Sequence, residues 1–265
     1  MNVAGIDCGA KFVKTIILDG DKILAKSSVL SGFDLKGAVE KALEKALKEA
    51  GLSVPDLACL MATGTGKEEV SMSHSKVTEM SANARAMNFL FPSVGTVIDA
   101  GAEEGRAIRV NEKGKVIDFA INEKCAAGTG RCMEVFADLV SVPIEEMGYL
   151  SFQVDEEPEP VSSTCVVFAK SEAVSLLRKG WPKEKVLAAY CSAMAHRVAE
   201  LLERIGIEKD FAITGGIAKN EGLVKRLVAK LKIKALEPTY NTQIAGALGG
   251  ALFAKELVEK ERGLR

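Results

Sequence analysis

The sequence predicts an α/β protein built from two similar halves. Stretches rich in apolar and β-branched residues, typical of strands, alternate with stretches of helical periodicity along the 265-residue chain. The segment GIDCG at 5–9 is echoed by VIDAG at 97–101, and in both places an Asp-x-Gly turn separates two strand-like runs. Asp and Gly are common turn formers, so this pair alone leaves open two coincident hairpins. A third glycine-rich turn, TGGIAKN at 214–220, favours the duplicated arrangement.

The first half is expected to cover residues 1–93 and to be completed by a C-terminal segment, 241–265. Its opening strands are joined by short turns such as Asp19-Gly20-Asp21. The elements expected here are strands at 2–9, 12–18, 21–30 and 57–62, a loop at 63–67, and helices at 34–51, 77–91 and 241–260. The last helix carries a face of small residues, which should pack closely against another element.

The second half is expected to cover residues 94–240. It restarts with strand, Asp-x-Gly turn and strand, and later reads as strand, Gly-Gly turn and helix at 210–231. The other elements expected here are a strand at 115–122 and helices near 128–140, 165–178 and 183–205. The acidic, proline-containing stretch 151–160 is the segment most typical of a linker.

Composition argues against several classes of function. The 35 basic and 36 acidic side chains nearly cancel, so the chain has no charge basis for binding nucleic acid or an anionic membrane surface. No secretory leader or transmembrane stretch is evident, which predicts a cytoplasmic protein. Six scattered cysteines favour reduced thiols over a disulfide framework, and only two histidines disfavour a histidine metal site. Any bound metal would therefore have sulfur or oxygen ligands.

The three turns are the expected parts of a nucleotide site. Gly9 has no Cβ, so its N–H can approach a phosphate closely. Asp7 and Asp99 are expected at the ends of strands that face each other, where they could hold Mg²⁺ through water. Gly215 and Gly216 would form a flat shelf for the adenosine and α-phosphate, beside the positive end of the following helix.

Two cysteines have unusual sequence contexts. The segment NEKCAAGTGR places Cys125 before a glycine-rich turn that leads into an amphipathic helix, and SSTCVVFAKSEAVSLL places Cys165 directly before another helix. The N-terminal N–H groups of a helix lower the pKa of a thiol and can hydrogen-bond to sulfide. These contexts favour thiolate chemistry over core filling. In contrast, Cys8, Cys59 and Cys191 lie in apolar runs typical of buried thiols.

The combined pattern resembles the actin/hexokinase/Hsp70 ATPase superfamily. Within it, the two cysteine segments, TGGIAKN and the C-terminal Q-x-x-GALGGAL resemble the ATP-dependent activators of 2-hydroxyacyl-CoA dehydratases, whose family includes the ATPase subunits of benzoyl-CoA reductase. The resemblance implies an actin-like (ribonuclease H-like) α/β fold, with two similar domains around a nucleotide cleft. It also implies Mg-ATP and one [4Fe–4S] cluster shared by two subunits, with Cys125 and Cys165 as the ligands from each. Two thiolates from each of two chains make the four that a cubane cluster takes.

The turns and the resemblance together give a set of expected site residues. The expected catalytic residues are Asp7, Asp99 and Glu103, the last as a candidate general base. The expected cofactor-binding residues are Gly9, Ala10, Lys11, Lys14, Gly101, Gly128, Gly215, Gly216, Asn220 and Gln243. Cys132 is left undecided between a supporting position near the cluster and a place in the core.

Three segments depart from the pattern that the resemblance implies. The usual Asp-x-Gly-Ser-Thr-x-x-Lys reads DCGAKFVK at 7–14, and the usual Asp-x-Gly-Gly-Gln-Asp reads DAGAEE at 99–104. A frequent Glu-x-x-x-His reads EMSAN at 79–83. The first turn thereby lacks two hydroxyls and the second lacks a glycine and a glutamine, so whether this chain hydrolyses ATP by itself stays open.

These departures favour an ATP-hydrolysing, iron–sulfur electron-transfer subunit of the benzoyl-CoA reductase type, because a subunit paired with a related ATPase chain can lose catalytic parts. A homodimeric activator of a 2-hydroxyacyl-CoA dehydratase is the second expectation. A small-metabolite kinase and a non-hydrolysing structural subunit are remoter ones. The implied partners are a related or identical ATPase subunit, CoA-thioester reductase or dehydratase subunits, and a ferredoxin or flavodoxin donor in an anaerobic cell.

Overall fold

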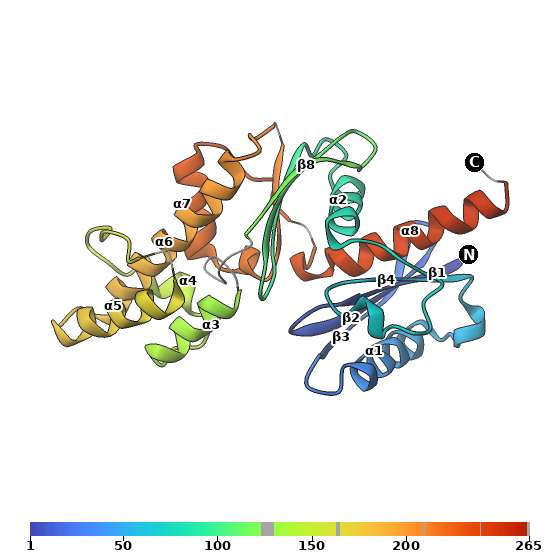
Figure 1. Cartoon of the computed structure of the whole chain (residues 1–265), viewed down its shortest axis with the longest axis horizontal. Helices are drawn as coiled ribbons and strands as arrows, with labels where there is room; N and C mark the ends of the chain where they lie inside the picture. Colours follow the sequence, from blue (N-terminus) through green and yellow to red (C-terminus); the bar gives the residue numbers. More distant parts are fainter. Residues whose placement is uncertain (123–129, 163–164, 209, 239, 264–265) are drawn as a thin grey trace. The chain divides into compact units, whose positions relative to one another are not determined.

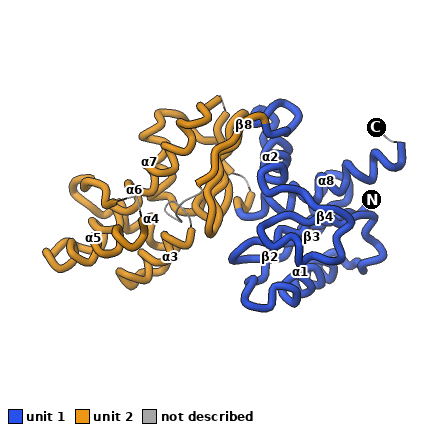
Figure 2. Tube along the Cα trace, viewed as in Figure 1, with its two compact units in different colours: residues 1–93, 110–116, 243–265 blue, residues 94–109, 117–242 orange. Residues whose placement is uncertain are grey.

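The chain forms two compact units (Figure 2), seen in a computed structural model that describes residues 1–122, 130–162, 165–208, 210–238 and 240–263. Unit 1 comprises residues 1–93, 110–116 and 243–265, and unit 2 comprises residues 94–109 and 117–242. Each unit contains a mixed β-sheet packed against helices.

Unit 1 is built on a five-stranded sheet in the order β3-β2-β1-β4-β5, in which β1, β2 and β3 are antiparallel neighbours and β4 is parallel to β1. Its strands are β1 (Asn2–Cys8), β2 (Phe12–Asp19), β3 (Lys22–Leu30), β4 (Cys59–Thr63) and β5 (Ser75–Lys76). Its helices are α1 (Leu35–Ala50), α2 (Glu79–Leu90) and α8 (Ala245–Glu261). The long elements expected from the sequence are therefore present, and the two-residue strand β5 is an addition.

The two faces of this sheet carry different helices. Successive residues of β1 point to opposite faces, and Ala4, Ile6 and Cys8 lie in one buried cluster with α1. On the other face, a Cβ on Gly5 would overlap the backbone oxygen of Ala247, so α8 packs directly on β1. Figure 1 shows α1 and α8 on opposite sides of the sheet.

Glycines of α8 determine how closely this helix approaches its neighbours. A Cβ on Gly249 would overlap the backbone oxygen of Ala82 in α2, and a Cβ on Gly250 would lie 3.3 Å from the Cα of Gly5. The close packing predicted for the small-residue face of the C-terminal helix is therefore confirmed.

Unit 2 is built on a four-stranded sheet in the order β8-β7-β6-β9. Its strands are β6 (Thr96–Ala100), β7 (Gly105–Val110), β8 (Val116–Ile121) and β9 (Phe211–Gly215). Its helices are α3 (Gly130–Leu139), α4 (Met147–Leu150), α5 (Val166–Arg178), α6 (Lys183–Glu203) and α7 (Glu221–Leu231). β6 runs antiparallel to β7 and parallel to β9, which repeats the relation of β1 to β2 and β4 in unit 1. The similar Asp-x-Gly segments at 5–9 and 97–101 therefore belong to hairpins that have the same strand topology in the two units.

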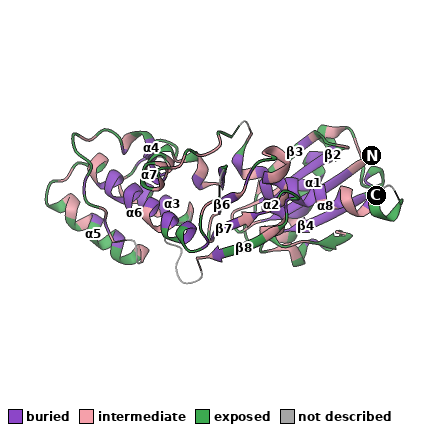
Figure 3. Ribbon diagram, turned by 90° about the horizontal axis from the view of Figure 1, so that it is seen from above, coloured by how far each residue is buried: buried purple, intermediate pink, exposed green. Residues whose placement is uncertain are grey.

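The core of unit 2 forms around α6, which is buried along most of its length, whereas α5 is largely exposed (Figure 3). The stretch 151–160, expected to be linker-like, contains no helix or strand and follows α4. It lies within unit 2 and is anchored there, because Arg226 forms an ion pair with Glu157 and donates to the backbone oxygen of Ser151 at 2.9 Å. None of the described helices combines the length and apolar character that a membrane span requires.

Candidate functional site

The two Asp-x-Gly turns have the same cross-strand partner arrangement. Asp7 on β1 lies opposite Lys14 on β2, with Nζ 2.8 Å from Oδ2. Asp99 on β6 lies opposite Arg106 on β7, with a guanidinium nitrogen 3.1 Å from Oδ2. Both aspartates are buried, and a buried carboxylate requires a partner of this kind. Each unit therefore presents an aspartate paired with a cation at the same strand position.

The first turn gathers three expected site residues within a few ångströms. A Cβ on Gly9 would lie 3.7 Å from Oδ1 of Asp7 and 3.8 Å from Nζ of Lys14. The hydroxyl of Ser31 donates to the backbone oxygen of Gly9 at 2.7 Å, and its N–H donates to that of Lys11 at 3.0 Å. The turn is therefore held from one side by a loop that follows β3.

Asp7 also lies against the beginning of α8. A Cβ on Gly246, the second residue of that helix, would lie 2.8 Å from Oδ2 of Asp7. The partial positive charge at a helix N-terminus favours a carboxylate there. Gln243, expected to bind the cofactor, lies in the short 3₁₀ turn Thr242–Ile244 that leads into α8. Ala10 is exposed at the tip of the first turn.

The second turn is tight and strongly charged. The N–H of Gly101 donates to the backbone oxygen of Glu104 at 2.9 Å. Glu104 is bound by the buried Arg106 at 2.6 Å, whereas Glu103 is exposed at the turn. Of the two adjacent carboxylates, Glu104 is therefore held by an internal guanidinium, and Glu103 is the more exposed.

A row of polar side chains crosses the sheet of unit 2 beside this turn. Arg106, Asp99 and Thr214 lie side by side on β7, β6 and β9. The hydroxyl of Tyr240 hydrogen-bonds to the side chain of Thr214. Burial raises the pKa of Tyr240 to about 12. The nearby charge of Asp99 adds to this increase, and the hydrogen bond to Thr214 partly opposes it. The phenol is thus neutral at physiological pH and contributes a hydroxyl to this row.

Arg106, Thr214 and Tyr240 were not among the residues expected from the sequence. A signal existed for Arg106, because it follows Asp99 by seven residues, as Lys14 follows Asp7. The approach of Tyr240 depends on a tertiary contact and has no counterpart in local sequence.

The third turn lies against the second within unit 2. Gly215 has φ +85° and pairs with Ala100, whose backbone a Cβ at this position would overlap. Asn220 caps α7, since its Oδ1 accepts from the N–H of Leu223 at 2.9 Å. Its Nδ2 is buried and has no hydrogen-bond partner among the described residues. A buried donor of this kind fits a contact with a ligand.

The cysteines separate into two groups. Cys165 is half-exposed and is the N-cap residue of α5, so its position before a helix is confirmed. Cys8, Cys59 and Cys191 are buried in the core, as expected. Burial, aided by the charges of Asp7 and Glu69, raises the pKa of Cys8 to about 11.

Burial also raises the pKa of Cys191 to about 11. Cys132 is 2% exposed and packs in the core of unit 2. Cys125 and Gly128 lie outside the described residues. Within the described ranges, no group of three or more His, Cys, Asp or Glu side chains is arranged to hold a metal ion.

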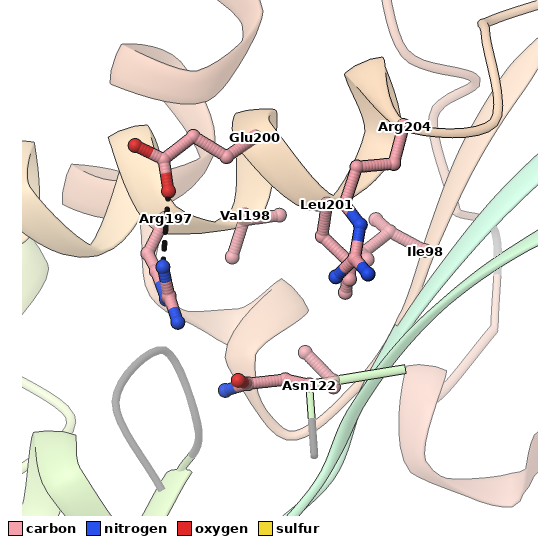
Figure 4. A pocket seen from close by; sticks show the side chains of 9 residues that line it. Ile98, Asn122, Arg197, Val198, Glu200, Leu201 and Arg204 are labelled. Carbon is pink, nitrogen blue, oxygen red and sulfur yellow. Dashed lines mark hydrogen bonds and ion pairs between the residues drawn. The ribbon is translucent and has the colours of Figure 1, made fainter. Parts of the chain in front are cut away.

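A small pocket lies on the α6 side of the sheet in unit 2 (Figure 4). It has a volume of about 80 Å³ and is lined by Ala100, Gly105, Asn122 and side chains of α6. Arg197 and Glu200, which form an ion pair at 3.1 Å, border it. Its volume is far below the roughly 300 Å³ of small-molecule sites, and none of the expected cofactor-binding residues lines it. This pocket is therefore not a nucleotide site.

Comparison with known proteins identifies the family. The activator of lactoyl-CoA dehydratase from Anaerotignum propionicum is 38% identical over 262 residues, which are 98% of this chain and 100% of that protein. A benzoyl-CoA reductase subunit from Thauera aromatica is 34% identical over 267 residues, covering 97% of this chain and 94% of that protein.

The solved structure of the activator of the 2-hydroxyisocaproyl-CoA dehydratase from Clostridium difficile with bound ADPNP matches this fold. Its TM-score is 0.93 at 32% identity, and the match covers 100% of this chain and 98% of that chain. The expected actin-like ATPase fold is thereby confirmed. Residues 4–254 match the sequence model of the BadF/BadG/BcrA/BcrD ATPase family, and the chain therefore belongs to this family.

Proposed function

We propose that this chain is an ATP-dependent electron donor that activates a 2-hydroxyacyl-CoA dehydratase. The sequence alone favoured a benzoyl-CoA reductase subunit, and the comparisons support the dehydratase activator better. The activator relative is 38% identical and matched over its whole length, and a second activator has a TM-score of 0.93. The benzoyl-CoA reductase relative is 34% identical. The reductase type therefore becomes the second candidate.

Mg-ATP would be held by the three turns. In this proposal Asp7 and Asp99 hold Mg²⁺ through water, as carboxylates commonly do for nucleotide-bound magnesium. Lys14 and Arg106, which pair with these carboxylates, add positive charge for the phosphates. The glycine turn at 215–216 and the buried Nδ2 of Asn220 would contact the remainder of the nucleotide.

Glu103 would act as the general base toward water. It is the more exposed acidic residue of the second turn, whereas Glu104 is bound by Arg106. A carboxylate that is not held by an internal cation can accept a proton from an attacking water.

The observation that carries the electron-transfer proposal is the position of Cys165. Cys165 is the N-cap residue of α5, and its side chain makes no capping hydrogen bond to the helix. A thiolate at this position would lie beside the N–H groups of the first turn, which favour the charged form. Close behind it in the first turn of α5, the apolar side chains of Val167 and Phe168 are 65% and 67% exposed. Such a surface fits burial against a second subunit that carries its own pair of thiols.

Cys165 and Cys125 of each chain would together hold one [4Fe–4S] cluster between two chains. When bound, the cluster would supply the low-potential electron, received from a ferredoxin or flavodoxin donor. This chain would provide two thiolates and the helix N–H groups beside them. It would also provide a nucleotide site whose occupancy changes the conformation of the protein around the cluster.

Iron analysis after anaerobic purification tests the proposal. About two irons and two sulfides per chain are expected, as for one cubane shared by two subunits. Cys165→Ser should lose this iron and remain folded by circular dichroism. The matched control is Cys132→Ser, because Cys132 is buried in the core and should not affect the iron content.

Two outcomes would count against the proposal. Wild-type protein without iron would exclude the electron-transfer function, and an iron content unchanged in Cys165→Ser would exclude the ligand assignment. Isolation of the native complex then separates the two candidates. An activator should be recovered as a homodimer that donates to a dehydratase, and a reductase subunit should be recovered with a related ATPase chain.

A further inference from the structure

The second turn is bonded directly to the beginning of α3. The N–H of Gly130 donates to the backbone oxygen of Gly101, and the N–H of Arg131 donates to that of Ala102, both at 2.9 Å. These donors belong to the first turn of α3, where N–H groups have no partner inside the helix. The helix thus begins on the carbonyl groups of the turn.

The geometry of the peptide bond gives this contact a direction. A trans peptide places its C=O and the following N–H on opposite sides, and no described peptide bond is cis. The two carbonyl groups that point at α3 therefore belong to the same peptide planes as the N–H groups of Ala102 and Glu103, which point away from α3. The C=O group of each peptide accepts a hydrogen bond from the helix, and the N–H group on the opposite side can donate to a phosphate.

The contact is also close. A Cβ on Gly130 would lie 3.3 Å from the backbone oxygen of Gly101 and 3.6 Å from the Cα of Ala102. Glycine therefore allows the helix to begin at hydrogen-bonding distance from the turn, and any larger residue must push the two apart by a few tenths of an ångström.

Beyond this contact, α3 follows the segment of Cys125 in the sequence and packs against the helix that begins after Cys165. Only four residues separate Cys125 from Gly130 in the chain. α3 also packs against α5, whose N-cap residue is Cys165, and buried side chains of both helices share one hydrophobic cluster. A displacement of α3 would therefore act on α5 and on Cys165 at its beginning.

We propose that Gly130 and Arg131 are positioning residues that couple the phosphate-binding turn to the cysteine segments through the backbone. This inference rests on the proposed function, because it requires a nucleotide at the second turn. A phosphate accepting from the N–H groups of Ala102 and Glu103 polarises the same two peptides that hold α3. Nucleotide binding then strengthens and shifts the attachment of the helix.

The test is hydrogen exchange of the α3 amides with and without the non-hydrolysable analogue ADPNP and Mg²⁺. In wild-type protein the analogue should slow exchange in α3 by about fivefold or more, the factor expected for one strengthened hydrogen bond. Arg131→Pro removes one donor, and proline is tolerated in the first turn of a helix. Gly130 has no Cβ to clash with the new ring. This variant should bind ADPNP and show a clearly smaller response in α3, since only the bond from Gly130 remains.

Arg131→Ala is the matched control. It keeps the N–H and removes only the side chain, whose ion pair with Glu134 spans 3.5 Å, so the response should persist. If Arg131→Pro does not fold, Gly130→Ala provides the second variant, because it keeps both donors and widens the gap. Its response in α3 should be reduced.

The outcomes distinguish this inference from the proposed function. Wild-type protein that binds ADPNP without any change in α3 would overturn the coupling and leave the nucleotide site intact. An undiminished response in both Arg131→Pro and Gly130→Ala would do the same. Failure of the wild-type protein to bind ADPNP would overturn the proposed function together with the coupling.

Discussion

Each aspartate predicted to hold magnesium lies opposite a basic residue that follows it by seven positions, and the two pairs differ in burial. The side chains of Arg106 and Asp99 are 7% and 9% exposed, whereas those of Lys14 and Asp7 are 18% and 12% exposed. Water screens the second pair more than the first. Loss of the cation should therefore have unequal consequences in the two units.

Arg106→Gln is expected to lower the free energy of unfolding by about 3 kcal/mol, because it leaves the buried carboxylate of Asp99 without its cation. The pair of Arg106 with Glu104 is lost as well, yet Glu104 is 44% exposed and can be solvated. Urea unfolding monitored by circular dichroism measures the change.

Lys14→Gln is the matched control, since it removes the equivalent cation from the first turn. The expected loss is smaller, about 2 kcal/mol, between the values for exposed and for buried ion pairs, because these two side chains are somewhat more exposed. Equal losses of unfolding free energy in the two variants would show that burial does not determine how much each ion pair contributes to stability.

At the scale of elements, α8 is the part of unit 1 that the sequence describes best. Its run of small residues predicts close packing, and the glycines do meet the backbones of α2 and β1. The consequence is that α8, α2 and β1 are held at a fixed spacing near Asp7. A methyl group at the tightest point should separate them.

Gly249→Ala is expected to lower the free energy of unfolding by about 3 kcal/mol, the upper range for overpacking, because the new Cβ would overlap the backbone oxygen of Ala82. Gly250→Ala provides the control one residue later. Its Cβ would lie 3.3 Å from the Cα of Gly5, a contact that small shifts can relieve, and alanine is the better helix former by up to about 1 kcal/mol. Chemical denaturation should rank Gly249→Ala as much the less stable, and an equal effect would contradict the packing argument.

Long elements with clear periodicity, such as α1, α6 and the strands of the two hairpins, could be predicted from the sequence. The strand β5 and the helix α4 could not, because two and four residues are too few to show a period. The ion pair that joins Glu157, in the irregular stretch 151–160, to the distant Arg226 could not be predicted either, since composition does not reveal such a contact. The bonds from Gly130 and Arg131 to the second turn involve only backbone atoms, and such contacts have no side-chain signature.

At the scale of the whole molecule, the formal net charge is −1, with 35 basic and 36 acidic side chains. With so small a net charge, global repulsion near neutral pH is weak. The dependence of stability on pH should then reflect individual buried groups. Four of these share one behaviour: burial is the largest cause of a raised pKa in Cys8, Cys59, Cys191 and Tyr240. The pKa values of Cys8, Cys191 and Tyr240 are raised the furthest.

These three acids predict that stability falls on the alkaline side. The pKa of each cysteine rises from 9.0 to about 11, and that of Tyr240 rises from 10.0 to about 12. Because folding favours their neutral forms, the stabilisation is complete below about pH 9 and is lost as the pH rises through the folded-state values. The melting temperature, measured between pH 7 and roughly 11, should be level at first and then decline. In Cys8→Ala/Cys191→Ala the decline should be shallower, since only Tyr240 of the three still titrates, and an identical decline would assign the alkaline loss to other groups.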